Sequence, residues 1–155
     1  MRIFISYCCF LLFAITAAAQ ESPNFSGTYA LTALKGEHKA KTLPKNTLKV
    51  THNADSLEIV ESFEDGKSLT RKYALNGGES KNLTSGGVPT TDRVEVKGKT
   101  LIIRSTYGSR AGVTIHETEK WELSADSKTL RIRDQTQVEG APMLDDTLNE
   151  IYQRK

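Results

Sequence analysis

The chain has 155 residues, of which 37% are hydrophobic and 26% charged, and its formal net charge is +2. This length allows one domain with its own hydrophobic core, and it excludes a TIM barrel or two ordinary domains. The nearly balanced charge gives no support to nucleic-acid binding, because proteins with that function usually carry a marked basic excess.

The first residues have the anatomy of a secretory signal peptide. Arg2 supplies a short positive start, an apolar run follows over Ile3–Ile15, and alanines at 17–19 suit a signal peptidase. We therefore predict a signal peptide over residues 1–19 and an exported mature domain over residues 20–155, in the periplasm or outside the cell. An uncleaved membrane anchor is the alternative. No later apolar run reaches the roughly 18 residues of a membrane span, so we expect no integral membrane segment after cleavage.

The sequence shows no pattern that is typical of a metal or cofactor site. Both cysteines, Cys8 and Cys9, lie in the predicted signal peptide, so the mature domain would have neither a disulfide nor a thiolate site. The histidines His38, His52 and His116 are far apart and show no metal-ligand spacing. We predict no metal site and no cofactor, and we expect hydrophobic burial to stabilise the fold.

Short runs of alternating apolar and polar residues, separated by Gly, Asn, Asp and Pro, fill the mature chain and predict β-strands. Nine strands are expected near Phe25–Thr32, Thr47–His52, Ser56–Phe63, Ser68–Leu75, Asp92–Val96, Thr100–Tyr107, Val113–Leu123, Lys128–Val138 and Thr147–Arg154, with a weaker tenth near Glu79–Thr84. A meander of this length favours an all-β fold, a single antiparallel up-and-down barrel, because closure removes exposed sheet edges. The lysine-rich segment Ala33–Asn46 is expected to form a loop or a single helical turn.

Alternation along two of these strands places acids on a face that is otherwise apolar. Glu117 and Glu119 share the parity of Trp121, and Asp134 shares the parity of Ile132 on the next strand. A buried carboxylate without a partner is costly, so something must compensate these three acids. Three explanations remain open: a wet barrel centre, a bound cation or ligand, or a β-bulge that turns part of a strand outward.

The third and fourth predicted strands form a hairpin for which two registers are open. A two-residue turn would point the apolar side chains of the two strands to opposite sides. A three-residue loop, Asp65–Lys67, would pair Ile59 with Tyr73 and Glu61 with Arg71. Because burial sets the register, we predict the second arrangement, which places Arg71 and Tyr73 on the inner face.

Both ends of the mature domain carry short motifs of a known family. The run FSGTY at Phe25–Tyr29 resembles the opening strand of the calycins, the lipocalin and fatty-acid-binding protein group, where a Phe-x-Gly-x-aromatic pattern closes the barrel base. The run IYQRK at Ile151–Lys155 resembles the last strand of the fatty-acid-binding branch. The stretch Trp121–Leu130 resembles a hairpin of small secreted bacterial lipocalin-like proteins, most of them without an assigned function. This resemblance implies a ten-strand barrel around a lumen.

The chain departs from the fatty-acid-binding branch at a position that concerns the ligand. Those proteins hold a carboxylate with an Arg-x-Tyr motif on the last strand, whereas Glu150 stands two residues before Tyr152 here. The segment Ala33–Asn46 is also short for the helical lid of that branch. The resemblance therefore implies the barrel shape and gives little support to a fatty acid as the ligand.

These observations predict a non-catalytic protein that binds a small hydrophobic or amphipathic ligand in the barrel lumen. Aromatic side chains would pack against its apolar part, and Arg71 with the acids would orient its polar part. The candidate ligand-binding residues are Tyr29, Arg71, Tyr73, Tyr107, Glu117, Glu119, Trp121 and Asp134. Two alternatives stay open: a filled barrel that acts through its outer surface as an interaction or inhibitor module, and a small hydrolase that uses inward carboxylates.

Overall fold

The computed structural model describes residues 23–36, 42–109 and 112–155, and the predicted signal peptide with its two cysteines lies outside them. The described residues form ten β-strands and one short 3-10 turn. The elements are β1 (Gly27–Gly36), β2 (Thr47–His52), β3 (Ser56–Ser62), β4 (Ser68–Ala74), β5 (Glu79–Leu83), β6 (Pro89–Lys97), β7 (Thr100–Gly108), β8 (Thr114–Leu123), β9 (Thr129–Val138), the turn η1 (Pro142–Leu144) and β10 (Asp146–Arg154). In this part of the chain, no helix has the length and apolar character needed to span a membrane.

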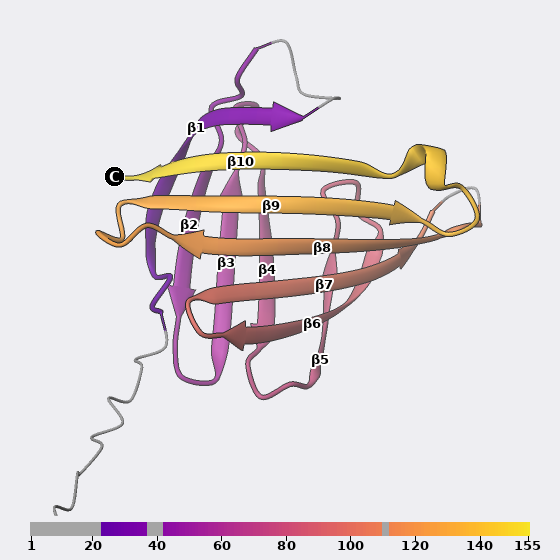
Figure 1. The fold of residues 1–155 in the computed structure, drawn as a ribbon, viewed down its shortest axis with the longest axis horizontal. Helices are drawn as coiled ribbons and strands as arrows, with labels where there is room; N and C mark the ends of the chain where they lie inside the picture. Colours follow the sequence, from indigo (N-terminus) through magenta and orange to yellow (C-terminus); the bar gives the residue numbers. More distant parts are fainter. Residues whose placement is uncertain (1–22, 37–41, 110–111) are drawn as a thin grey trace, which may run out of the picture.

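The strands form one antiparallel sheet in the order β4-β3-β2-β1-β10-β9-β8-β7-β6-β5. In Figure 1, β2, β3 and β4 run steeply, and β7 to β10 run across them on the other side of the interior. The sheet therefore curls into a nearly closed barrel, with β4 and β5 at its two edges. This arrangement confirms the predicted all-β, single up-and-down barrel, including the weaker tenth strand.

Strand β1 belongs to both sides of the barrel. Its first residues, Gly27–Ala30, pair with β2, and residues from Tyr29 to Gly36 pair with β10, with a register shift between Leu31 and Ala33. Such a bulge bends a strand, and in Figure 1 β1 turns from the steep strands to lie beside β10. The expected loop or helical turn was therefore wrong for Ala33–Gly36, which continue β1 because β10 satisfies their backbone groups. Residues 37–41 of that segment lie outside the described residues.

The residues around Phe25, at the start of the barrel, pack with the C-terminal strand β10 and close the barrel base. Tyr29 donates a hydrogen bond from its hydroxyl to the carbonyl oxygen of Phe25 at 2.9 Å, and Arg154 Nη2 donates to the Tyr29 hydroxyl at 2.8 Å. The Phe25 ring meets Trp121 edge-on, with 6.3 Å between ring centroids. Phe25, Tyr29 and Trp121 are fully buried, so this end of the barrel is filled by side chains.

The register predicted for the β3–β4 hairpin was wrong. The structure pairs Ile59 with Arg71 and Glu61 with Leu69, so the partner of Ile59 is displaced by two residues from the predicted Tyr73. A displacement by two leaves every side chain on the same face of the sheet. Arg71 and Tyr73 therefore still face the interior.

Loop geometry explains this difference in register. Phe63 donates its N–H to the carbonyl oxygen of Lys67 at 2.9 Å, which makes Glu64–Gly66 the three-residue loop. Gly66 has a φ of 82°, the left-handed conformation that commonly ends such a loop and that glycine adopts without a steric penalty.

Candidate functional site

A cavity of about 210 Å³ lies inside the barrel, beyond the packed base. Leu83 lines it and is 48% exposed, so the cavity reaches the surface beside the turn between β5 and β6. Its apolar wall comes from Leu48, Leu69, Leu83 and Ile132. Six acids also line it, namely Glu61, Asp92, Glu117, Glu119, Asp134 and Glu150, whereas Arg71 is the only basic residue among the described lining residues. The cavity is therefore strongly acidic in composition.

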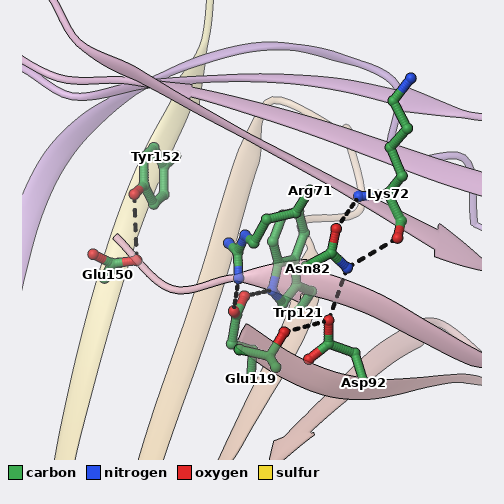
Figure 2. A network of polar contacts seen from close by, with 9 residues as sticks. Arg71, Lys72, Asn82, Asp92, Glu119, Trp121, Glu150 and Tyr152 are labelled. Carbon is green, nitrogen blue, oxygen red and sulfur yellow. Dashed lines mark hydrogen bonds and ion pairs between the residues drawn. The ribbon is translucent and has the colours of Figure 1, made fainter. Parts of the chain in front are cut away.

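Arg71 and Glu119 form a buried ion pair across the barrel, from β4 to β8. Arg71 Nη1 contacts Glu119 Oε1, and the two side chains are only 17% and 8% exposed. The other Glu119 oxygen accepts a hydrogen bond from Trp121 Nε1 at 2.8 Å, as Figure 2 shows. Burial works against the charge of Arg71, but Glu119 raises the pKa of the guanidinium above its ordinary value. Arg71 is therefore charged, and Glu119 is its counter-ion.

Glu117 on β8 and Asp134 on β9 form a second pair on the cavity wall. Burial and the neighbouring Glu117 raise the pKa of Asp134 to about 9, and a hydrogen bond joins the two carboxyl groups. Burial and the nearby Glu119 also raise the pKa of Glu117. Two neighbouring carboxyl groups do not both ionise readily, because their negative charges repel each other. The pair therefore holds a proton at neutral pH. Burial and Glu117 raise the pKa of the adjoining Tyr107 to about 12.

Glu150 and Tyr152 lie together on the inner face of β10. The Tyr152 hydroxyl donates a hydrogen bond to Glu150 Oε2 at 3.3 Å. Burial and the negative charge of Glu119 raise the pKa of Glu150 to about 7. The residue that the sequence marked only as a departure from an Arg-x-Tyr motif is thus a further acid of the cavity.

Asp92 on β6 presents one carboxylate oxygen without a partner. Its Oδ2 accepts hydrogen bonds from Asn82 Nδ2 at 2.8 Å and from Thr90 Oγ1 at 2.9 Å. Asp92 is 1% exposed, and its Oδ1 has no hydrogen-bond partner; the same holds for the hydroxyl of Tyr73, which is 3% exposed. Arg71 Nε and Asp134 Oδ1 are also buried without a hydrogen-bond partner. All four residues line the cavity, so these polar atoms remain available there.

The structure divides the eight residues singled out from the sequence into two groups. Those that line the cavity are Arg71, Tyr73, Tyr107, Glu117, Glu119 and Asp134. Tyr29 and Trp121 instead lie in the packed base. Trp121 remains connected to the cavity through its hydrogen bond to Glu119.

Sequence reasoning left three acids of the cavity out of its candidate site. Glu61 was placed on the inner face but not among the ligand-binding residues, and Asp92 and Glu150 were not placed inside at all. The signal was available in the alternation, since Asp92 shares the parity of Val94 and Glu150 that of Tyr152. Both acids stand in strands whose inner face is otherwise apolar at the neighbouring inward position, as Val94 and Tyr152 show.

The cavity acids are not arranged as a metal site. Among residues 23–36, 42–109 and 112–155, no group of three or more His, Cys, Asp or Glu side chains has the geometry to hold a metal ion. The chemistry that this arrangement offers is therefore hydrogen bonding and charge, with one proton shared between Glu117 and Asp134.

No protein-family profile matches this sequence, and no curated protein matches it either. Solved structures, in contrast, share the fold. The zebrafish ileal bile acid-binding protein complexed with cholic acid is 17% identical, with a TM-score of 0.62 over 84% of this chain and 98% of that chain. Fatty-acid-binding protein 1 of Echinococcus granulosus is 12% identical, with a TM-score of 0.59 over 84% and 96%. Human cRBP IV is 14% identical, with a TM-score of 0.61 over 86% and 99%.

The shared feature is the fold. These structures confirm the calycin-type barrel that the terminal motifs implied. At identities this low, the likeness carries no ligand or residue role across to this chain.

Proposed function

We propose that this protein is an exported, non-catalytic carrier that holds a small ligand inside its barrel. The observation that carries the proposal is the cavity, whose described lining residues hold four buried polar atoms without a hydrogen-bond partner: Arg71 Nε, Tyr73 Oη, Asp92 Oδ1 and Asp134 Oδ1. Buried polar atoms are nearly always hydrogen-bonded, so these atoms require a partner. A bound molecule with hydrogen-bonding groups would supply it, while the leucines and Ile132 of the wall would cover its apolar part.

The fold neighbours give this proposal general support. Two of them are named for the fatty acids or bile acids that they bind, and they use the same barrel architecture. Those ligands are anions, whereas this cavity is lined by acids. The fold neighbours therefore support ligand binding but not the identity of the ligand. Export follows from the anatomy of residues 1–19 in the sequence.

Native mass spectrometry of the mature protein, isolated from its own host, tests the carrier function. We expect a stoichiometric low-mass molecule that denaturation releases. Ser105 lines the cavity and is 6% exposed, so Ser105→Phe fills the space that the ligand would occupy. The adjacent Thr106 is exposed, and Thr106→Phe serves as the matched control.

The wild type and Thr106→Phe should carry the molecule, and Ser105→Phe should lack it while keeping a folded barrel. A wild-type protein that is empty in every preparation would overturn the carrier function. Retention of the molecule by Ser105→Phe would place the ligand elsewhere.

The Glu117–Asp134 pair favours a second candidate function, a small hydrolase. Two inward carboxyl groups that share a proton resemble the catalytic dyad of aspartic proteases. Its test is turnover of a panel of small chromogenic peptides, nitrophenyl esters and glycosides. Hydrolysis that Glu117→Gln abolishes, and that Glu122→Gln on the outer face of β8 leaves intact, would support an enzyme; no turnover above background would exclude it.

A further inference from the structure

We propose that the ligand of this cavity is a small organic cation, with a protonated amine on a compact apolar body. The inference rests on the proposed carrier function and adds the chemical class of the molecule carried. Three features of the cavity lead to it: its charge, its unpartnered acceptor and its size.

The first feature is an excess of carboxyl groups over bases. Glu119 already neutralises Arg71, and Glu119 also accepts a hydrogen bond from Trp121, although the N–H of Arg71 Nε has no partner. The other five lining acids are Glu61, Asp92, Glu117, Asp134 and Glu150. The described residues of the wall supply no second base for them. The Glu117–Asp134 pair holds one proton at neutral pH, and burial raises the pKa of Glu150 to about 7, so protonation removes part of this negative charge. The carboxyl groups that remain ionised repel an anion and attract a cation.

The second feature is the fixed carboxylate of Asp92. Asn82 and Thr90 both donate to Oδ2, which holds the group in one orientation and leaves Oδ1 free. Asp92 is 1% exposed, so bulk water does not satisfy this atom. Oδ1 is a hydrogen-bond acceptor, and the partner must therefore bring an N–H or O–H donor. An ammonium group supplies three donors together with the complementary charge.

The third feature is size. At about 210 Å³ the cavity is smaller than the roughly 300–1,000 Å³ of ordinary drug-sized sites. Leu48, Leu69 and Ile132 give its wall an apolar portion that would cover a single ring or a short aliphatic chain. The unpartnered hydroxyl of Tyr73 faces the same space and can accept a second hydrogen bond from the ligand.

The test compares probes that share a body and differ in charge. One set is 2-phenylethylamine, 2-phenylethanol and phenylacetate, and the other is hexylamine, hexan-1-ol and hexanoate. Each is titrated at neutral pH into full mature protein that has been freed of bound molecules, with calorimetry to measure the dissociation constant. We expect at least one amine to bind about tenfold or more tightly than the alcohol and the carboxylate of its own set.

Two variants of one strand locate the binding. Glu117→Gln removes a carboxyl group from the cavity, and Glu122→Gln removes one from the outer face of the same strand, where it pairs with Lys120. Glu117→Gln should weaken amine binding by about tenfold, and Glu122→Gln should leave it unchanged. Glu61→Gln, on β3, is a second cavity variant if Glu117→Gln fails to fold.

The outcomes separate this inference from the carrier function beneath it. If an alcohol or carboxylate binds as tightly as the amine of its own set, the proposal of a cationic ligand is overturned and the carrier function still stands. Failure of all six probes, together with an empty protein in native mass spectrometry, would overturn both. If none of the six probes binds but the native protein carries a ligand, only the proposal that the ligand is a small cation is overturned. Amine binding that Glu117→Gln and Glu61→Gln leave unchanged would also overturn it.

Discussion

Arg71 shows how a charged side chain can be held in the interior of a small barrel. Its guanidinium pairs with Glu119, and Glu119 is fixed in turn by the indole of Trp121. A buried ion pair of this kind adds little net stability, because desolvation offsets much of its attraction, but removal of one partner leaves the other charge uncompensated. The pair therefore fixes the geometry of the cavity wall.

Glu119→Gln should destabilise the fold by about 3 kcal/mol, because Arg71 would stay buried without its counter-ion. Urea unfolding followed by circular dichroism measures the free energy of unfolding. Glu122→Gln is the control, since that side chain is 48% exposed on the same strand and should change stability little. Equal stability of Glu119→Gln and the wild type would show that the pair does not contribute to the fold.

Asp134→Asn should stabilise the protein, and the gain should grow with pH. Burial and Glu117 raise the folded-state pKa of Asp134 from its ordinary 3.8 to about 9. The protonated form is favoured by folding, so this stabilisation is complete below pH about 4 and is lost as the pH rises towards 9. The neutral amide avoids that loss, by about 1–3 kcal/mol at pH 8.

Thermal unfolding at pH 4, 6 and 8 checks this dependence. Asp55→Asn, in the exposed turn between β2 and β3, is the control and should show no such trend. A constant difference between Asp134→Asn and the wild type across this pH range would contradict the raised pKa.

At the level of elements, the barrel has a seam between β4 and β5, where no ladder of backbone hydrogen bonds joins the two strands. The two strands are the edges of the sheet, and side chains join them instead of a backbone ladder. Asn82 accepts a hydrogen bond from the Lys72 N–H at 2.8 Å and donates to the Lys72 carbonyl oxygen at 2.9 Å, and the Ala74 N–H donates to Ser80 Oγ at 2.9 Å. Figure 2 shows Asn82 between Lys72 and Asp92. Asn82 thus helps to close the barrel, together with Ser80, and also orients the free acceptor of the cavity.

Asn82→Ala should lower the free energy of unfolding by about 1–3 kcal/mol, because the Lys72 backbone groups and Asp92 lose hydrogen bonds together. Hydrogen exchange should also accelerate at the Lys72 amide. The control is Asn149→Ala, an exposed asparagine on β10. Unchanged stability and unchanged exchange at Lys72 would mean that the seam is held by other contacts.

The sequence predicted the strands and their inner faces, because alternation alone determines which side chains point inward. Glu117, Glu119 and Asp134 were placed correctly by parity, without any knowledge of their partners. The β3–β4 register was not predictable in this way, because it depends on the left-handed Gly66 at the end of the loop. The pairing of Arg71 with Glu119 was also out of reach, since β4 and β8 meet only across the barrel.

At the scale of the whole molecule, the barrel has a filled end and a hollow end. Large apolar side chains occupy the base around Phe25 and Trp121, and carboxyl groups line the space beyond it. The filled barrel that the sequence left open as an alternative thus describes the base alone, and the proposed ligand would occupy the hollow end. The acids on the inner face need no outward bulge, because they surround a cavity.

Export makes a prediction for the whole chain. Cleavage after Ala19 would leave Gln20 as the first residue and would keep Phe25, the first residue of the packed base. The intact mass and N-terminal sequence of the native protein, recovered from outside the cytoplasm, check this. Retention of Met1 in the recovered protein would instead indicate an uncleaved anchor.

The most direct test of a ligand in the acidic cavity uses the indole N–H resonance of Trp121, the only tryptophan of the chain. This group donates to Glu119 on the cavity wall, so a molecule that enters beside Glu119 must shift its signal in a nitrogen–proton correlation spectrum. We expect a saturable shift on titration with 2-phenylethylamine or hexylamine, and its loss in Ser105→Phe. A resonance that neither amine moves, or that moves equally in Ser105→Phe, would contradict a ligand-holding cavity for small cations.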